Sequence, residues 1–237
     1  MERIDLYALV HKGLRAELFE TATEVARTEF AGAAGAEPTL RRVRCLLGFL
    51  DEHARHEDSH IMPLVAAQAP RLAAEIAAEH LRVEAAHQGL GALLERLERA
   101  PLELRAGLAR QLHEELTLLV ALHVAHMQRE ESEVNRALWA GHDDALLGAA
   151  HAAILADIAP QRLAQWLELM LPAMHAGERA ELIGGLHAKM PREAFERLLA
   201  PARHRLGESA WSKCAARSAI PAEHVRFVAS AALERAS

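Results

Sequence analysis

Four long segments, in which apolar residues recur every three or four positions, constrain the fold of this chain more than any other feature. Good helix formers dominate all four segments, and runs of β-branched or aromatic residues that alternate with polar ones are absent from the sequence. The breaks between segments are short and rich in glycine and proline. The segments span roughly residues 3–30, 39–69, 71–99 and 102–140.

Long amphipathic helices joined by short connections are typical of antiparallel neighbours in a helical bundle. We therefore predict an all-α fold in which residues 1–140 form an up-down antiparallel four-helix bundle. Residues 141–237 follow a shorter pattern, since prolines divide them into helices of about 10–16 residues. We expect this region to be a smaller C-terminal all-helical module. The prolines that we expect to break it are Pro160, Pro172, Pro191, Pro201 and Pro221.

The charge balance excludes several partners. The chain carries 27 basic and 33 acidic residues, a formal net charge of −6, so it lacks the concentrated positive surface that nucleic acids and anionic membranes require. The longest apolar stretch is too short to span a bilayer, and the first residues show no basic leader before an apolar run. We expect a cytoplasmic protein without a nucleic-acid or membrane partner.

Histidine is abundant, with 15 residues against five Phe, three Trp and one Tyr. Its placement is more informative than its number, because ionisable residues interrupt the apolar stripe of each long segment. A stripe of leucine would be the more stable choice, since buried imidazoles and carboxylates need polar partners. The interrupting residues are His11, then His53 and Glu57, then His80 and His87, then His123, His126 and Glu130.

Metal ions explain such a pattern. His53 with Glu57, and His126 with Glu130, are spaced four residues apart, so each pair shares one helix face and can reach a common centre. A mixed set of imidazoles and carboxylates suits iron, manganese or zinc, and the absence of thiolates disfavours softer metals. We therefore predict a metal site inside the bundle.

The first 140 residues resemble the hemerythrin-like, or HHE cation-binding, domains. The resemblance rests on a single histidine, an HxxxE pair, a second histidine and a second HxxxE pair, in that order over four helices, with Pro63 after the first pair. In that family these positions hold two non-haem irons, with the carboxylates bridging them. The resemblance implies His11, His53, His80 and His126 as terminal ligands and Glu57 and Glu130 as bridges.

One departure from the family concerns the third helix. Hemerythrins proper carry HxxxH there, whereas the position four residues after His80 is Glu84. A fifth ligand then comes from elsewhere or one iron keeps a different coordination, and reversible O2 carriage is in doubt. The candidates for this place are Glu84, His87, His123 and His60.

Three functions remain open on the sequence alone. The first is a metal-binding protein that uses two irons, or zinc or manganese in their place, to bind or sense O2, nitric oxide or a related small oxidant, or to handle iron. The second is a di-iron oxidase or peroxidase, so an enzyme is not excluded, although non-catalytic binding is favoured. The third is a metal-free helical interaction protein.

The region from Ile158 onward resembles the helical tail of some bacterial hemerythrin-like proteins and shows no catalytic constellation. The sequence also leaves open whether the protein forms a homo-oligomer.

Overall fold

The computed structural model describes residues 3–31 and 35–218. All regular secondary structure within these ranges is helical. The prediction of an all-α protein is therefore confirmed. The chain divides into two compact units, Met1–Ile154 and Leu155–Ser237, which are described separately below. None of the helices in the described ranges is long and apolar enough to cross a membrane.

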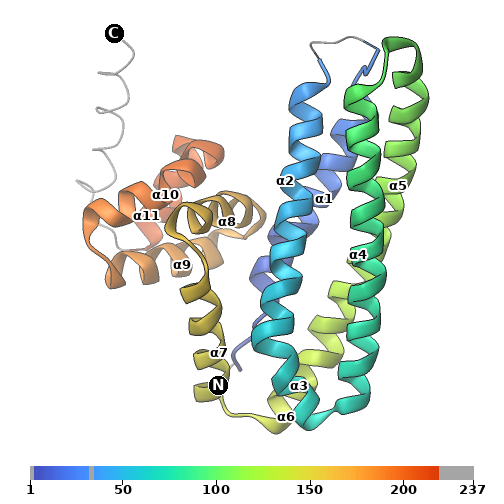
Figure 1. Cartoon of the computed structure of the whole chain (residues 1–237). Helices are drawn as coiled ribbons and strands as arrows, with labels where there is room; N and C mark the ends of the chain where they lie inside the picture. The colour runs from blue at the N-terminus through green and yellow to red at the C-terminus, as the bar shows by residue number, and fades with distance from the viewer. Residues whose placement is uncertain (1–2, 32–34, 219–237) are drawn as a thin grey trace. The chain divides into compact units, whose positions relative to one another are not determined.

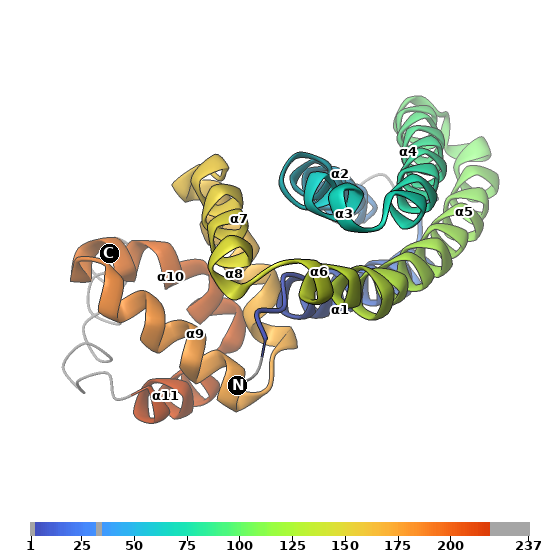
Figure 2. The ribbon, with the colours of Figure 1, turned by 90° about the horizontal axis from the view of Figure 1, so that it is seen from below.

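Four long helices make up most of the first unit: α1 (Ala8–Arg27), α2 (Glu37–His56), α4 (Pro70–Arg99) and α5 (Leu102–Arg129). Helix α1 contacts α2 and α5, and α4 contacts α5 and α2. Each of the four runs in the opposite direction to the one before it (Figures 1 and 2). Their leucine stripes face inward, because burial of these apolar side chains drives the packing. Leu14, Leu50, Leu90 and Leu116 are each at most 1% exposed.

Two of the long helices change their hydrogen-bonding pattern near one end. Helix α2 continues through a π-helical segment, Glu57–Ile61, into α3 (Met62–Gln68). Helix α5 continues in the same way through Glu130–Val134 into α6 (Asn135–Gly141). Short π-helical segments inside α-helices are rare and are often found at functional sites. Both segments begin at a glutamate of the predicted metal site.

The first unit extends beyond residue 140, where we expected it to end. Helix α7 (Asp144–Asp157) places Leu147 in an apolar cluster of the first unit, where it is 0% exposed. Arg3 fixes this end of the unit, since its Nε donates to Asp144 Oδ1 over 2.7 Å and its Nη1 donates to the carbonyl of Trp139. The chain between residues 141 and 154 therefore belongs with the long helices.

The second unit contains α8 (Pro160–Ala173), α9 (Ala176–Lys189), α10 (Arg192–Leu206) and α11 (Glu208–Arg217). Helix α8 contacts α10, and α9 contacts α11. The core of this unit is built around buried Trp166, Phe195, Leu199 and Trp211.

The prolines of the second unit break the chain less often than we expected. Pro160 opens α8 and Pro191 precedes α10, as the sequence predicts. Pro172 and Pro201 lie inside α8 and α10, so the prediction of helix breaks there is wrong. Each removes one N–H from the hydrogen-bond ladder and crowds the carbonyl four residues before it, yet both helices continue past the proline. Pro221 lies outside the described residues.

Candidate metal centre

Six of the residues that the sequence singles out lie together between the long helices of the first unit. They form two groups, each with one ligand atom per residue and all atoms of a group within 4.8 Å of one another. Glu57 and Glu130 belong to both groups, and the groups differ only in their histidines. One group takes His11 and His53, and the other takes His80 and His126.

The first group joins α1 to the ends of α2 and α5. His11 Nε2 lies 3.0 Å from His53 Nε2 and 3.5 Å from Glu130 Oε2. His53 Nε2 lies 2.9 Å from Glu57 Oε1. These distances bring two imidazole nitrogens and one oxygen of each carboxylate to a common point.

The second group joins α4 to the same two carboxylates. His80 Nε2 lies 3.6 Å from Glu57 Oε2 and 3.8 Å from Glu130 Oε1. His126 Nε2 lies 3.3 Å from Glu130 Oε1. Each glutamate therefore presents oxygen to both groups, which is the arrangement that bridging between two cations requires.

The hydrogen bonding of this cluster is incomplete. Both carboxylate oxygens of Glu57, both of Glu130 and Nε2 of His80 are buried and have no hydrogen-bond partner among the described residues. His53 is close to Glu57 but not in hydrogen-bonding geometry. Buried carboxylates that lack partners cost several kcal/mol each, so they are normally paired or bound to metal. The unpaired lone pairs fit two cations, one at each group.

Three further carboxylates hydrogen-bond to Nδ1 of three of the four histidines, on the side of each ring that faces away from the two groups. His11 Nδ1 lies 3.0 Å from Glu131, His80 Nδ1 lies 2.8 Å from Asp58, and His126 Nδ1 lies 3.0 Å from Glu79. A carboxylate on one ring nitrogen of a metal-binding histidine fixes the ring and directs the other nitrogen at the metal. In all three rings the nitrogen left for the metal is Nε2.

These supporting carboxylates follow a simple rule in the sequence. Asp58 and Glu131 come directly after Glu57 and Glu130, and each bonds a histidine of another helix. Glu79 directly precedes His80 and bonds His126 on α5. Sequence reasoning did not assign them this role, although an acid directly beside Glu57, His80 and Glu130 was the available signal.

The metal-free centre holds protons where cations would bind. Burial lowers the pKa of His11, but the carboxylates of Glu131, Glu57 and Glu130 outweigh it and raise the pKa to about 9. Burial likewise lowers the pKa of His80, and Glu130, Glu57 and Asp58 raise it to about 9. Burial raises the pKa of Glu57, yet the nearby His53 and His11 hold it well below its usual range.

We expect metal affinity to rise with pH between about 6.5 and 9. His11 and His80 both have a pKa of about 9, so below that pH both rings carry a proton that a cation must displace. Each proton released changes the affinity by about tenfold per pH unit. Two protons therefore change the combined affinity for both ions by up to about 100-fold per pH unit. Competition between the protein and a coloured chelator for Zn²⁺ at pH 6.5, 7.5 and 8.5 measures this slope. An affinity that is flat over the range would contradict the assignment of both histidines.

The remaining candidates lie outside the two groups. His87 and His123 pair with each other, with their Nε2 atoms 2.8 Å apart, and Asp51 lies 2.5 Å from His87 Nδ1. Burial and the charge of His87 keep the pKa of His123 well below its usual range. Glu84 is exposed and accepts a hydrogen bond from Gln88, and His60 is half-buried. None of the four joins the six ligand atoms in the described structure.

A cavity of about 550 Å³ between α2 and α4 reaches one side of the centre. His80 and His87 line it, together with three carboxylates and one guanidinium, those of Asp51, Asp58, Glu84 and Arg55. Its acidic lining suits the approach of a cation, because negative charge in a cleft concentrates positive ions.

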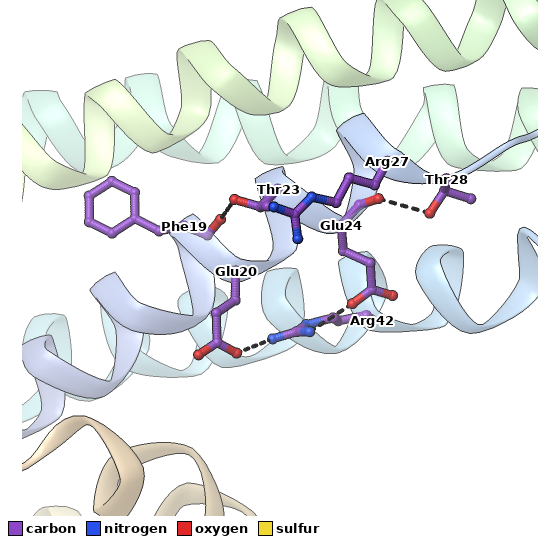
Figure 3. Close-up of a pocket in the computed structure, with 7 residues that line it drawn as sticks. All are labelled: Phe19, Glu20, Thr23, Glu24, Arg27, Thr28 and Arg42. Carbon is purple, nitrogen blue, oxygen red and sulfur yellow. Dashed lines mark hydrogen bonds and ion pairs between the residues drawn. The ribbon is translucent and has the colours of Figure 1, made fainter.

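A second cavity, of about 460 Å³, lies on the outer side of α1 and α2 and is lined by seven residues, none of them histidine. Glu20 and Glu24 point toward Arg42 across the two helices (Figure 3). The guanidinium also donates to Glu17 over 2.7 Å. Because Arg42 of α2 pairs with three carboxylates of α1, we interpret this cluster as a structural ion-pair network that joins the two helices.

Comparison of the chain with protein-family models, with curated proteins and with solved structures gave no match. The fold and the site therefore define the class on their own. This is an all-helical protein with buried histidine and glutamate groups that could hold metal ions.

Proposed function

We propose that the protein is a hemerythrin-like protein that holds two non-haem irons within an up-down four-helix bundle and binds or senses a small oxidant such as O2 or nitric oxide. One observation carries this proposal above the others. Two four-residue groups share both of their carboxylates and differ in their pairs of histidines. A single-metal site has no use for this duplication.

The ligand set supports iron over softer metals. Four imidazoles and two carboxylates make a site of intermediate hardness, which suits iron, manganese and zinc. The order of these ligands along the chain adds the resemblance to the hemerythrin-like family. When bound, the two irons would supply a redox-active position at which a small molecule can bind.

The protein's own residues would perform the remaining tasks. Glu57 and Glu130 would bridge the two cations, and the four histidines would each take one terminal position. Asp58, Glu79 and Glu131 would keep the proton on Nδ1 of their histidines, so that the Nε2 lone pairs face inward.

The oxidase alternative receives less support. Carboxylate-rich di-iron enzymes of the ferritin type use two ExxH pairs with further glutamates. The two such strings here are Glu57 with His60 and Glu84 with His87, and only Glu57 belongs to the metal-binding groups. The centre is therefore richer in histidine than in carboxylate, which favours binding over oxidation chemistry.

Metal analysis of the protein tests the proposal. We expect about two irons per chain after expression with added iron, and an optical spectrum that changes on exposure to O2 or nitric oxide. Turnover of peroxide well above that of free iron would favour the enzyme instead. Protein that binds no iron, zinc or manganese would refute both, and would favour a metal-free interaction protein.

A further inference from the structure

The only tyrosine of the chain, Tyr7, is buried next to the candidate metal centre without using its hydroxyl. Its side chain is 0% exposed, and the hydroxyl has no hydrogen-bond partner among the described residues. Its ring lies beside that of His11, with the ring centroids 5.2 Å apart. A buried hydroxyl without a partner is costly, and buried tyrosines normally find one.

Tyr7 belongs to a layer of side chains that closes one end of the centre. Its other members are Ile61, Ile76 and Val134, all at most 2% exposed and all in one cluster with Tyr7. Each lies four residues along the chain from one ligand, as Tyr7 does from His11 and Ile76 does from His80. The tyrosine hydroxyl is the only polar side-chain group among these four residues. The layer therefore offers it no partner.

The centre that Tyr7 borders through His11 contains two carboxylates, Glu57 and Glu130. A tyrosine hydroxyl carries a proton at neutral pH and can donate a hydrogen bond. The oxygens of both glutamates also lack hydrogen-bond partners among the described residues, and two bound cations would occupy their lone pairs.

We propose that the Tyr7 hydroxyl donates a hydrogen bond to the small anion or reduced diatomic molecule that binds at the two-metal centre, and so sets the ligand class of that centre. This inference rests on the proposed function. A donor at this place favours ligands that carry negative charge on an exposed atom, because hydrogen bonds to charged acceptors are the stronger ones. The three aliphatic side chains beside it keep water away from the bound ligand.

Azide binding to the iron-loaded protein tests the proposal, with Tyr7→Phe as the variant. Phenylalanine keeps the ring and removes the donor. We expect the variant to bind about two irons, as the wild type does, and to bind azide about 10- to 100-fold more weakly. Optical titration of each protein with azide measures both affinities.

Thr21→Val is the matched control. Thr21 lies on α1, the helix that begins directly after Tyr7, is 0% exposed, and donates its hydroxyl to Glu17 over 3.4 Å. It is ten residues from His11, or about 15 Å along the helix. Its substitution removes a buried hydroxyl of α1 without approaching the centre, so azide affinity should equal that of the wild type.

A readout that needs no metal accompanies the titration. After treatment with a chelator, the Tyr7→Phe protein should melt a few degrees above the wild type, because an unpaired buried hydroxyl has been removed. A lower melting temperature would overturn the inference, since the hydroxyl would then have a protein partner. Asn135 would be the first residue to examine for that role, because it is buried one turn beyond Glu131 and its amide has no hydrogen-bond partner in the described part of the chain.

The outcomes separate this inference from the proposed function. Wild-type protein without bound metal overturns both. Wild-type protein that binds iron but not azide, or a Tyr7→Phe variant that binds azide as tightly as the wild type, overturns the role of Tyr7 alone.

Discussion

Replacing Glu57 by alanine will remove both metal ions from the protein, not one. Its two carboxylate oxygens face different groups, with Oε1 toward His53 and Oε2 toward His80. Loss of a supporting residue behind a ligand already weakens metal binding about 10- to 100-fold, so loss of a shared ligand should cost more than 100-fold at both positions. Metal content should fall from about two per chain to near zero at a metal concentration that saturates the wild type.

The contrast with single histidines makes this result diagnostic. Glu130→Ala should behave like Glu57→Ala, because Glu130 is the other shared residue. His53→Ala and His126→Ala each leave one group with all four of its residues, so each variant should retain about one ion per chain. Equal losses in all four variants would argue against two separate positions bridged by the glutamates.

Two substitutions serve as controls. Glu84 is exposed on α4, four residues from His80, and His204 is exposed on α10 of the second unit. Alanine at either position should leave metal content unchanged. Loss of metal in Glu84→Ala would show that Glu84 is a ligand after all. Loss of metal in His204→Ala would show that the metal does not bind at the two groups of the first unit.

The spacing of apolar residues was enough to locate the long helices and the inner position of the six grouped residues. Leucine stripes fix the buried face of a helix, so an ionisable residue on that stripe must lie inside. The same reasoning could not separate His87 and His123 from the six. They lie on the same stripes, and only the packed structure shows that they contact each other and lie outside the two groups.

Other features depend on interactions that local sequence does not encode. A π-helical segment is stabilised by the packing around it, so the sequence near Glu57 or Glu130 does not indicate the change from α-helical to π-helical hydrogen bonding. Asp58 is largely exposed, with 55% of its side chain accessible, and its bond to His80 forms only when α2 and α4 come together. The end of the first unit was missed for the same reason, since Leu147 becomes a core residue through contacts with distant segments.

Metal should also prevent the loss of stability that alkaline pH causes in the metal-free protein. In the metal-free state His11 and His80 have a pKa of about 9, against about 6.5 in the unfolded chain. A raised pKa contributes stability that is complete below about pH 6.5 and is lost as the pH rises through 9. The metal-free protein should therefore become less stable over this interval.

The loaded protein should instead keep its stability over this interval, because its histidines carry no proton and those of the unfolded chain carry none above about pH 6.5. Two ions, each present at 100 times its Kd, add about 5 kcal/mol of stability, which corresponds to a rise in Tm of about 10–20 °C. This gain should grow with pH, as metal affinity does. Thermal melts at pH 6.5, 7.5 and 8.5, with Zn²⁺ and with a chelator, measure both slopes. Glu57→Ala should show no gain with Zn²⁺ at any pH, whereas His204→Ala should match the wild type. Parallel slopes with and without metal would mean that the ions bind elsewhere than at the buried histidines.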